Sequence, residues 1–315
     1  MQRIVSGFLV IDKPVGTTSA QVVARVKRLT GAKKVGHTGT LDPFATGVLI
    51  CCLNQATRLA GYLLKDNKRY RAVLRLGIAT DTQDSTGEVI SRSELDVTGL
   101  TPDAVTAAFR AFEGTFQQQP PVYSALKHQG VPLYKLARMG KPVQKAPREV
   151  SVSRLVIEKI DLPEVTFEAT CSAGTYIRTL AADIGARLGC GGHLTALRRL
   201  ASGPFGLDLA LSLDQLEAAA SEERLARHIV PAAQALENCP RIVAGQRLLA
   251  KVFHGQPLTL EDIGPMVPTT NEADEPILVM SADERLMAVL GFQPDTEKLS
   301  YHCVFTDEIN ASGIV

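Results

Sequence analysis

A segment rich in glycine and threonine, residues 36–47 with the sequence GHTGTLDPFATG, contains a single acidic residue, Asp42. Gly36 and Gly39 allow backbone angles that most residues avoid, and Pro43 restricts the chain directly after the carboxylate. The segment can therefore hold one acid rigidly. Aspartate before proline is also common in simple turns, so the residue types alone leave a structural role open.

Two features beside this segment favour a nucleic acid as the partner. The preceding residues, 27–34, are basic, and the segment itself contains His37. A planar histidine ring can stack on a nucleotide or hydrogen-bond to it. A lone histidine is more often structural, so this observation supports the hypothesis without deciding it.

Two further side chains could act beside the acid. Tyr70 lies on the apolar face of the alternating run RYRAVLRL, residues 69–76, and Arg178 follows Tyr176 by two residues at a predicted helix start. A buried carboxylate resists ionisation, and an adjacent guanidinium would counter that resistance and orient both oxygens. By residue type alone, Tyr70 could equally be a core tyrosine and Arg178 a surface arginine.

The distribution of charge is uneven along the 315 residues. Residues 1–200 contain 27 basic and 16 acidic residues, whereas residues 201–315 contain 7 basic and 17 acidic ones. Such asymmetry indicates a polyanionic partner for the first part, although solvated charged faces would give the same count. Candidate phosphate-binding residues are Lys27, Arg28, Lys33, Lys34, Lys135, Arg138, Lys141, Lys145 and Arg148.

Composition excludes several classes of protein. Hydrophobic residues make up 45% and charged residues 21%, as in ordinary globular proteins. We expect no signal peptide and no membrane span, because the apolar runs are too short. The six cysteines show no CxxC spacing, so neither a zinc site nor a disulfide framework is predicted. These features predict a cytoplasmic protein with reduced thiols.

The pattern of elements predicts an α+β fold. Ser19 is expected to cap a helix with Val22 and Val26 on its buried face, and residues 31–47 are expected to form a loop. Because strands and helices do not alternate regularly, we expect a mixed, largely antiparallel sheet with flanking helices. The other predicted elements are strands at 7–14, 69–76, 150–160 and 165–171, an apolar segment at 48–53, and helices at 102–112 and within 172–188.

A small β-rich domain is predicted after a polar stretch at residues 238–240. Short β-like runs follow at 276–280, 285–292 and 301–305. The predicted domains are therefore residues 1–238 and residues 239–315.

Four motifs in order resemble one known family. DKPVGTTS, GHTGTLDPFATGVL, KRYRAVLRLG and SAGTYIRTLAADIG are similar to the motifs of bacterial tRNA pseudouridine synthases of the TruB type. The resemblance extends from about Gly7 to Phe205. It implies a pseudouridine synthase fold for residues 1–238 and a PUA-like RNA-binding domain for residues 239–315.

The resemblance also implies an activity, the isomerisation of uridine 55 in the T loop of tRNA to pseudouridine. Asp42 matches the catalytic aspartate, Tyr70 the ring against the target uracil, and Arg178 the cation beside the aspartate. The reaction exchanges a C1′–N1 bond for a C1′–C5 bond, so no cofactor and no metal are expected. The aspartate could attack C1′, attack C6 of the base, or remove a ribose proton.

The remaining positions that match the family would bind substrate. Tyr176 and Leu197 would line the uridine pocket, and His37 would contact the rearranged T loop. Lys13 and Pro14 would support the floor of the site. The target base must leave the folded RNA, so base flipping on tRNA by a monomeric enzyme is expected.

Two rival functions remain at this point. A catalytically idle tRNA-binding or tRNA-folding protein could retain the fold, although intact Asp42, Tyr70 and Arg178 argue against it. A glycosidase or nucleosidase would need a second carboxylate near Asp42. The matched motifs offer none, but Asp81, Asp84 and Asp183 are not excluded.

Overall fold

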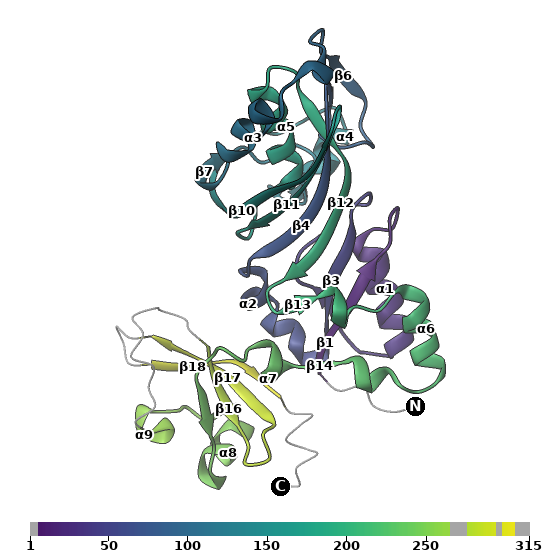
Figure 1. The fold of residues 1–315 in the computed structure, drawn as a ribbon. Helices are drawn as coiled ribbons and strands as arrows, with labels where there is room; N and C mark the ends of the chain where they lie inside the picture. Colours follow the sequence, from purple (N-terminus) through teal and green to yellow (C-terminus); the bar gives the residue numbers. More distant parts are fainter. Residues whose placement is uncertain (1–5, 265–275, 294–297, 306–315) are drawn as a thin grey trace.

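A large mixed sheet forms the frame of the first part of the chain (Figure 1). The computed structural model describes residues 6–264, 276–293 and 298–305. Apart from a parallel contact between β3 and β12, neighbouring strands pair antiparallel, which confirms the predicted largely antiparallel sheet. The strands along the sheet are β14 (Val230–Pro231), β1 (Gly7–Lys13), β3 (Thr46–Leu53), β12 (Gly192–Ser202), β4 (Lys68–Leu76), β11 (Glu164–Cys171), β10 (Arg148–Asp161) and β7 (Gly114–Gln118).

Short elements extend this frame. β2 (Val35–His37) pairs with β3, and β13 (Phe205–Gly206) pairs with β12. Two small hairpins, β5–β6 and β8–β9, stand apart from the large sheet. The remaining short elements are η1 (Asn54–Leu59), α2 (Ala60–Leu64), β5 (Ile78–Thr80), β6 (Val89–Arg92), η2 (Val97–Gly99), β8 (Lys127–His128), β9 (Val131–Pro132), α4 (Leu133–Arg138), η3 (Leu207–Leu209), η4 (Leu225–His228) and α7 (Ala232–Ala235).

Four longer helices cover one face of the sheet and share its main hydrophobic core. They contribute Val22, Val26, Phe109, Leu180 and Leu216 to a single buried cluster with the inward side chains of the strands. Each such side chain stabilises the fold by about 1.5–3 kcal/mol relative to exposure. The helices are α1 (Ser19–Thr30), α3 (Pro102–Arg110), α5 (Ile177–Arg187) and α6 (Leu213–Ser221).

The cap of α1 corrects one prediction. Thr18, not Ser19, is the N-cap, and its hydroxyl accepts a hydrogen bond from the Gln21 backbone N–H at 3.2 Å. Ser19 is buried instead, where its hydroxyl donates to the Leu41 carbonyl and accepts from the Leu41 N–H. The serine therefore ties the helix start to the segment that carries Asp42.

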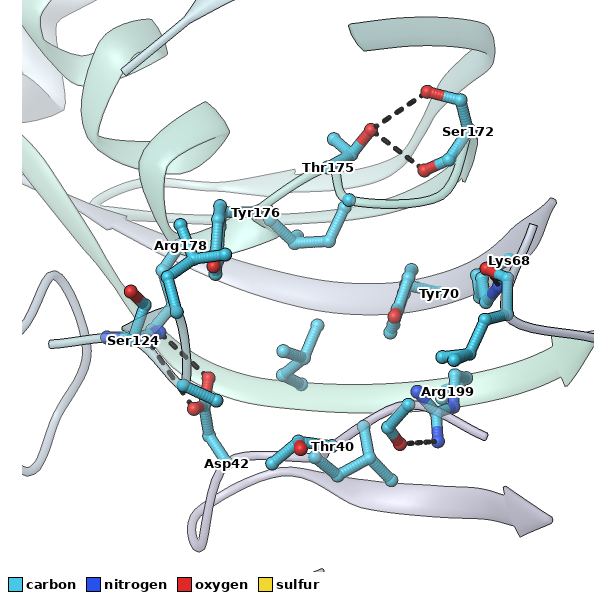
Figure 2. Close-up of a pocket in the computed structure, with 18 of the residues that line it drawn as sticks. Thr40, Asp42, Lys68, Tyr70, Ser124, Ser172, Thr175, Tyr176, Arg178 and Arg199 are labelled. Atoms are coloured by element: carbon cyan, nitrogen blue, oxygen red, sulfur yellow. Dashed lines mark hydrogen bonds and ion pairs between the residues drawn. The ribbon is translucent and has the colours of Figure 1, made fainter. Parts of the chain in front are cut away.

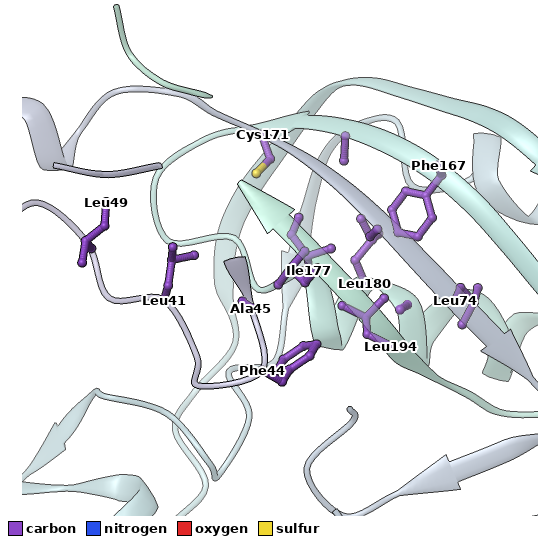
Figure 3. Close-up of a cluster of buried hydrophobic side chains, with 14 of the residues drawn as sticks. Leu41, Phe44, Ala45, Leu49, Leu74, Phe167, Cys171, Ile177, Leu180 and Leu194 are labelled. Carbon is purple, nitrogen blue, oxygen red and sulfur yellow. The ribbon is translucent and has the colours of Figure 1, made fainter. Parts of the chain in front are cut away.

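That segment is more ordered than the loop we predicted for residues 31–47. Val35–His37 form β2, so Gly36 is an ordinary strand residue. Gly39 has a φ of 112°, which glycine adopts without strain. Leu41, Phe44 and Ala45 then insert into the main core beside Ile177 of α5 (Figure 3). Burial of the residues on both sides of Asp42 fixes the position of its backbone.

A second, four-stranded sheet follows at the end of the described chain. Its strands are β15 (Arg241–Val243), β16 (Pro276–Met280), β17 (Leu286–Gln293) and β18 (Lys298–Val304), with helices α8 (Gln246–Phe253) and α9 (Leu260–Ile263). The three predicted β runs are thus confirmed within the described residues.

This second sheet packs behind β1 and β3, on the face opposite the main core. Phe8 and Ile50 of the large sheet share a buried cluster with Leu278, Val289 and Phe305. The large sheet and the second sheet therefore share one layer of buried apolar side chains. No helix in residues 6–264, 276–293 and 298–305 is long and apolar enough to cross a membrane.

Candidate active site

One cleft, of about 560 Å³, collects the predicted reactive side chains (Figure 2). Its walls come from the Asp42 segment, β4, β12, the start of α5 and the chain between β7 and β8. Asp42 and Arg178 lie at one end, Arg199 and Lys68 lie at the other, and Tyr70 lies between them. The cleft therefore joins residues that are up to 160 positions apart, from Gly39 to Arg199.

The central contact is an ion pair between Asp42 and Arg178. Arg178 Nε lies 2.8 Å from Asp42 Oδ2, and Arg178 Nη2 lies 3.4 Å from Oδ1. The arginine side chain is 4% exposed, whereas the aspartate side chain keeps 35% exposure towards the cleft. The pair thus presents a carboxylate to an incoming substrate while burying its counter-ion.

Three further acceptors hold the guanidinium of Arg178. Its Nη1 donates to the Thr82 carbonyl at 2.6 Å, and its Nη2 donates to the Tyr123 carbonyl at 2.7 Å. Nη1 also lies 3.5 Å from Asp84 Oδ2. Charge-assisted contacts to several fixed acceptors restrict the arginine to one orientation.

The sequence left open whether Asp84 lies beside Asp42 as a second catalytic carboxylate. Its Oδ1 accepts hydrogen bonds from the Thr82 hydroxyl, the Thr86 N–H and the Thr86 hydroxyl, at 2.6–2.9 Å. Its other oxygen faces Arg178. Asp84 therefore anchors the arginine that Asp42 also contacts, which differs from the water-activating partner that a glycosidase would need.

The ionisation of Asp42 is a balance of opposing causes. Burial raises the pKa of the Asp42 carboxyl above its ordinary value, and the charge of Arg178 lowers it. The negative charge of Asp84 raises the same pKa, and Lys13 lowers it. Arg178 is thus the group that most favours the ionised form needed for chemistry.

Three predicted pocket residues line the cleft together. Tyr70 and Leu197 come from the adjacent strands β4 and β12, and Tyr176 immediately precedes α5. Burial raises the pKa of the Tyr70 hydroxyl, so this ring is neutral at physiological pH. The guanidinium of Arg148 stacks on the Tyr176 ring, 4.9 Å from its centroid. Two rings and a leucine provide flat apolar surface of the kind that receives a nucleobase.

Lys13 and Pro14 lie beneath the Asp42 segment and do not line the cleft. The Lys13 ammonium is buried and donates to the carbonyls of Pro14, Thr17 and Pro43, the last directly after Asp42. Burial lowers the pKa of Lys13 to about 8. Lys13 thus ties the chain on both sides of the site together, and its predicted role in supporting the floor stays a prediction.

His37 lies in β2, opposite Cys51 of β3, and is also separate from the residues that line the cleft. Burial lowers the pKa of its imidazole, so the ring is neutral at physiological pH. A contact with the RNA beyond the flipped base is compatible with this position.

Arg199 is a cleft residue that sequence reasoning missed. Its guanidinium is buried and donates from Nε to the Val48 carbonyl at 2.6 Å and from Nη2 to the Gly39 carbonyl at 3.1 Å. It thereby connects the Asp42 segment to the sheet. The only signal in the sequence was an arginine pair, Arg198 and Arg199, of which Arg198 bonds Asp12 near the surface.

No group of three or more His, Cys, Asp or Glu side chains is placed to hold a metal ion among the residues that the structure describes.

Family models match both walls of the cleft. A model described as the N-terminal domain of TruB family pseudouridylate synthases matches residues 27–177. A model described as the C-terminal domain of tRNA pseudouridylate synthase B matches residues 178–237. The first match contains Asp42 and Tyr70, and the second contains Arg178 and Leu197, so the site needs both.

Curated relatives match most of the chain. The tRNA pseudouridine synthase B of Geobacter sulfurreducens is 51% identical over 257 residues, which cover 82% of this chain and 84% of that protein. The protein of the same name from Geotalea uraniireducens is 47% identical over 283 residues, covering 90% of each chain.

A solved structure has the same fold. A chain of the archaeal box H/ACA sRNP Nop10–Cbf5 complex aligns with a TM-score of 0.70 and 27% identity, covering 96% of this chain and 87% of that one. With relatives about half identical over most of their length, and with a cleft built across both family matches, the chain belongs to the TruB family of pseudouridylate synthases.

Proposed function

We propose that this enzyme converts uridine 55 in the T loop of tRNA to pseudouridine, with Asp42 as its catalytic carboxylate. The observation that carries the proposal is the 2.8 Å contact between Asp42 and Arg178 in a cleft walled by Tyr70 and Tyr176. The names of the curated relatives support tRNA as the substrate.

The reaction makes a specific demand on this cleft. The C1′–N1 bond of the uridine breaks, a C1′–C5 bond forms, and the proton on C5 is released while a proton is returned to N1. Asp42 must be ionised at the start, either to attack the substrate or to assist departure of the base. Arg178 supplies the adjacent charge that favours this form despite burial.

The rings of the cleft serve the detached base. The uracil must stay in place while it turns so that C5 replaces N1, and Tyr70 and Leu197 offer a surface against which it can rotate. The uridine has to leave the RNA stack first, at a cost of a few kcal/mol. Basic residues such as Lys33 and Lys34, both exposed beside β2, would offset that cost through phosphate contacts.

The second sheet, in the predicted domain 239–315, would act mainly as a brace. Residues 239–315 are acidic, with 11 acidic against 5 basic residues, which disfavours a phosphate grip. Its packing behind β1 and β3 supports the strands that hold Lys13 and the Asp42 segment. A PUA-like contact with RNA would then involve few charges. We also propose that the enzyme acts as a monomer in the cytoplasm.

A T-loop RNA labelled with tritium at C5 of its uridines tests the proposal. The wild-type enzyme should release tritium and form pseudouridine at position 55. Asp42→Asn should release none while still binding the RNA, because only one charge in the cleft changes.

Two results would overturn the proposal. Binding without release by the wild-type protein would instead establish the tRNA-binding or tRNA-folding function that the intact cleft argues against. Full turnover by Asp42→Asn would remove the aspartate from the chemistry.

A further inference from the structure

The start of α5 lacks a side-chain cap of its own. Tyr176 is the N-cap residue, and its hydroxyl makes no capping bond to the helix backbone. The first N–H groups of a helix have no partner within the helix, so a start without a cap is stabilised from elsewhere or frays. Here the two residues that need accurate placement, Tyr176 and Arg178, lie directly at this helix start.

Gln118, at the end of β7, holds the backbone of the N-cap residue from outside the helix. Its carboxamide oxygen accepts a hydrogen bond from the Tyr176 N–H at 2.8 Å, and its carboxamide nitrogen donates to the Tyr176 carbonyl at 3.0 Å. The side chain is 1% exposed. Because one partner only donates and the other only accepts, a single orientation of the carboxamide satisfies both bonds.

The chain that leaves Gln118 reaches the same helix start a second time. The Tyr123 carbonyl, five residues later, accepts from Arg178 Nη2 at 2.7 Å. The segment 118–123 therefore contacts α5 at two points, one at each of the two residues that project into the cleft. Two anchors fix both the position and the rotation of this helix start.

We propose that Gln118 is a positioning residue for catalysis: its carboxamide holds the backbone of Tyr176 so that the Tyr176 ring lines the cleft and the Arg178 guanidinium faces Asp42. Gln118 lines no part of the cleft and acts only through Tyr176. The inference rests on the proposed reaction, which supplies the activity that is measured.

The substitution Gln118→Glu gives a reversible test. When ionised, glutamate presents a second acceptor to the Tyr176 carbonyl and the clamp is lost. When protonated, its C–O–H group can donate to that carbonyl while the other oxygen accepts from the N–H, so the clamp is restored. Burial favours the protonated form and brings this titration towards the range in which the enzyme works.

The experiment measures the single-turnover rate on T-loop RNA between about pH 6 and pH 8.5. At each pH, the rate of Gln118→Glu is divided by the rate of the wild-type enzyme. We expect the ratio to rise as the pH falls, by about tenfold, since small displacements of reacting groups cost that much or more. Because ionisation of a buried glutamate would also destabilise the fold as the pH rises, circular dichroism measures the folded fraction at each pH, and the rate is expressed per folded enzyme. A flat ratio in a folded variant would overturn the proposal.

If the glutamate variant unfolds at high pH, the substitution Gln118→Met tests the same proposal. Methionine has similar length and no charge, and it should lower kcat by about tenfold with KM within about twofold of wild type. Gln117→Met, on the exposed position before it, is the matched control and should match wild type. Unchanged kcat in folded Gln118→Met would refute the positioning role, whereas an inactive wild-type enzyme would refute the proposed function instead.

Discussion

The two ends of the cleft each contain a buried arginine, and the two arginines have different partners. Arg178 faces carboxylates, with Asp42 at 2.8 Å and Asp84 at 3.5 Å. Arg199 faces backbone carbonyls, those of Val48 and Gly39, and contacts no acidic side chain among the described residues. One end of the cleft therefore sets the ionisation of Asp42. The other end mainly fixes the path of the chain, although Arg199 also acts on the Tyr70 hydroxyl.

The two arginines are therefore expected to have different roles, Arg178 in the reaction and Arg199 in the shape of the cleft. Loss of Arg178 changes the ionisation of Asp42 and leaves the Asp42 segment anchored by Leu41 and Phe44 in the core. Loss of Arg199 leaves the ion pair in place but frees the Gly39 carbonyl from the sheet. Substitutions at the two ends should therefore differ in which quantity they alter most, rate or stability.

Arg178→Lys should have the largest effect. An ammonium cannot reproduce the planar fork that reaches both oxygens of Asp42 and two carbonyls. We expect kcat to fall by about 10²–10³, the range for loss of one preorganised electrostatic contact. Single-turnover assays measure it, and Arg187→Lys, exposed on the same helix, is the control. A rate near that of wild type would show that charge alone suffices.

Arg199→Lys should act mainly on stability. One or two buried carbonyls lose their partner, which costs about 1–3 kcal/mol each. We expect a lower urea midpoint and a decrease in kcat smaller than that of Arg178→Lys. Arg198→Lys, in the neighbouring surface pair, should change neither quantity appreciably. A large loss of rate at unchanged stability would assign Arg199 to the chemistry. The proposed difference between Arg178 and Arg199 would then be wrong.

Asp84→Asn should shift the pH dependence in the direction opposite to loss of Arg178. The amide oxygen can still accept from Thr82 and Thr86, but the negative charge that raises the pKa of Asp42 is removed. Since activity needs ionised Asp42 and is lost as pH falls through its pKa, the acidic limb should move to lower pH. A pH–rate profile that moves to higher pH would contradict the balance of charges described here.

Lys33→Ala should have the smallest effect. That effect should be on tRNA binding and not on the reaction in the cleft. The side chain is exposed beside β2, where it can meet a phosphate without touching the reacting base. tRNA binding should weaken several-fold, with the slope of log affinity against log salt reduced by about one, and kcat should be unchanged. An unaltered salt dependence would exclude a phosphate contact at this position.

The sequence predicted the parts of the fold that follow simple periodicity. β4 has Ala72, Leu74 and Leu76 buried and Arg69 and Arg71 exposed, as its alternation indicated. β12 was not predicted although it lies in the middle of the sheet. Two irregularities in its pairing with β4, near Ala196 and near Arg199, break the alternation that identifies a strand.

The candidate site was predicted where a residue stood inside a recognisable motif. Asp42, Tyr70, Tyr176 and Arg178 stand inside the quoted motifs and line the cleft. Leu197 lies outside those motifs, was placed by the family resemblance, and lines the cleft as well. Three residues that hold others in place across long separations were not assigned these roles, and Asp84 was considered only as a second carboxylate. Asp84, Gln118 and Arg199 each act on another residue through a partner more than 50 positions away, and no local pattern encodes such a pairing.

Arg178 is expected to keep the partly buried carboxylate of Asp42 ionised. Carbon-13 NMR of the aspartate carboxyl groups measures this directly, with the Asp42 signal identified by its loss in Asp42→Asn. We expect a midpoint above that of an exposed aspartate in the wild-type enzyme, and a further rise in Arg178→Gln. An equal or lower midpoint in Arg178→Gln would contradict it.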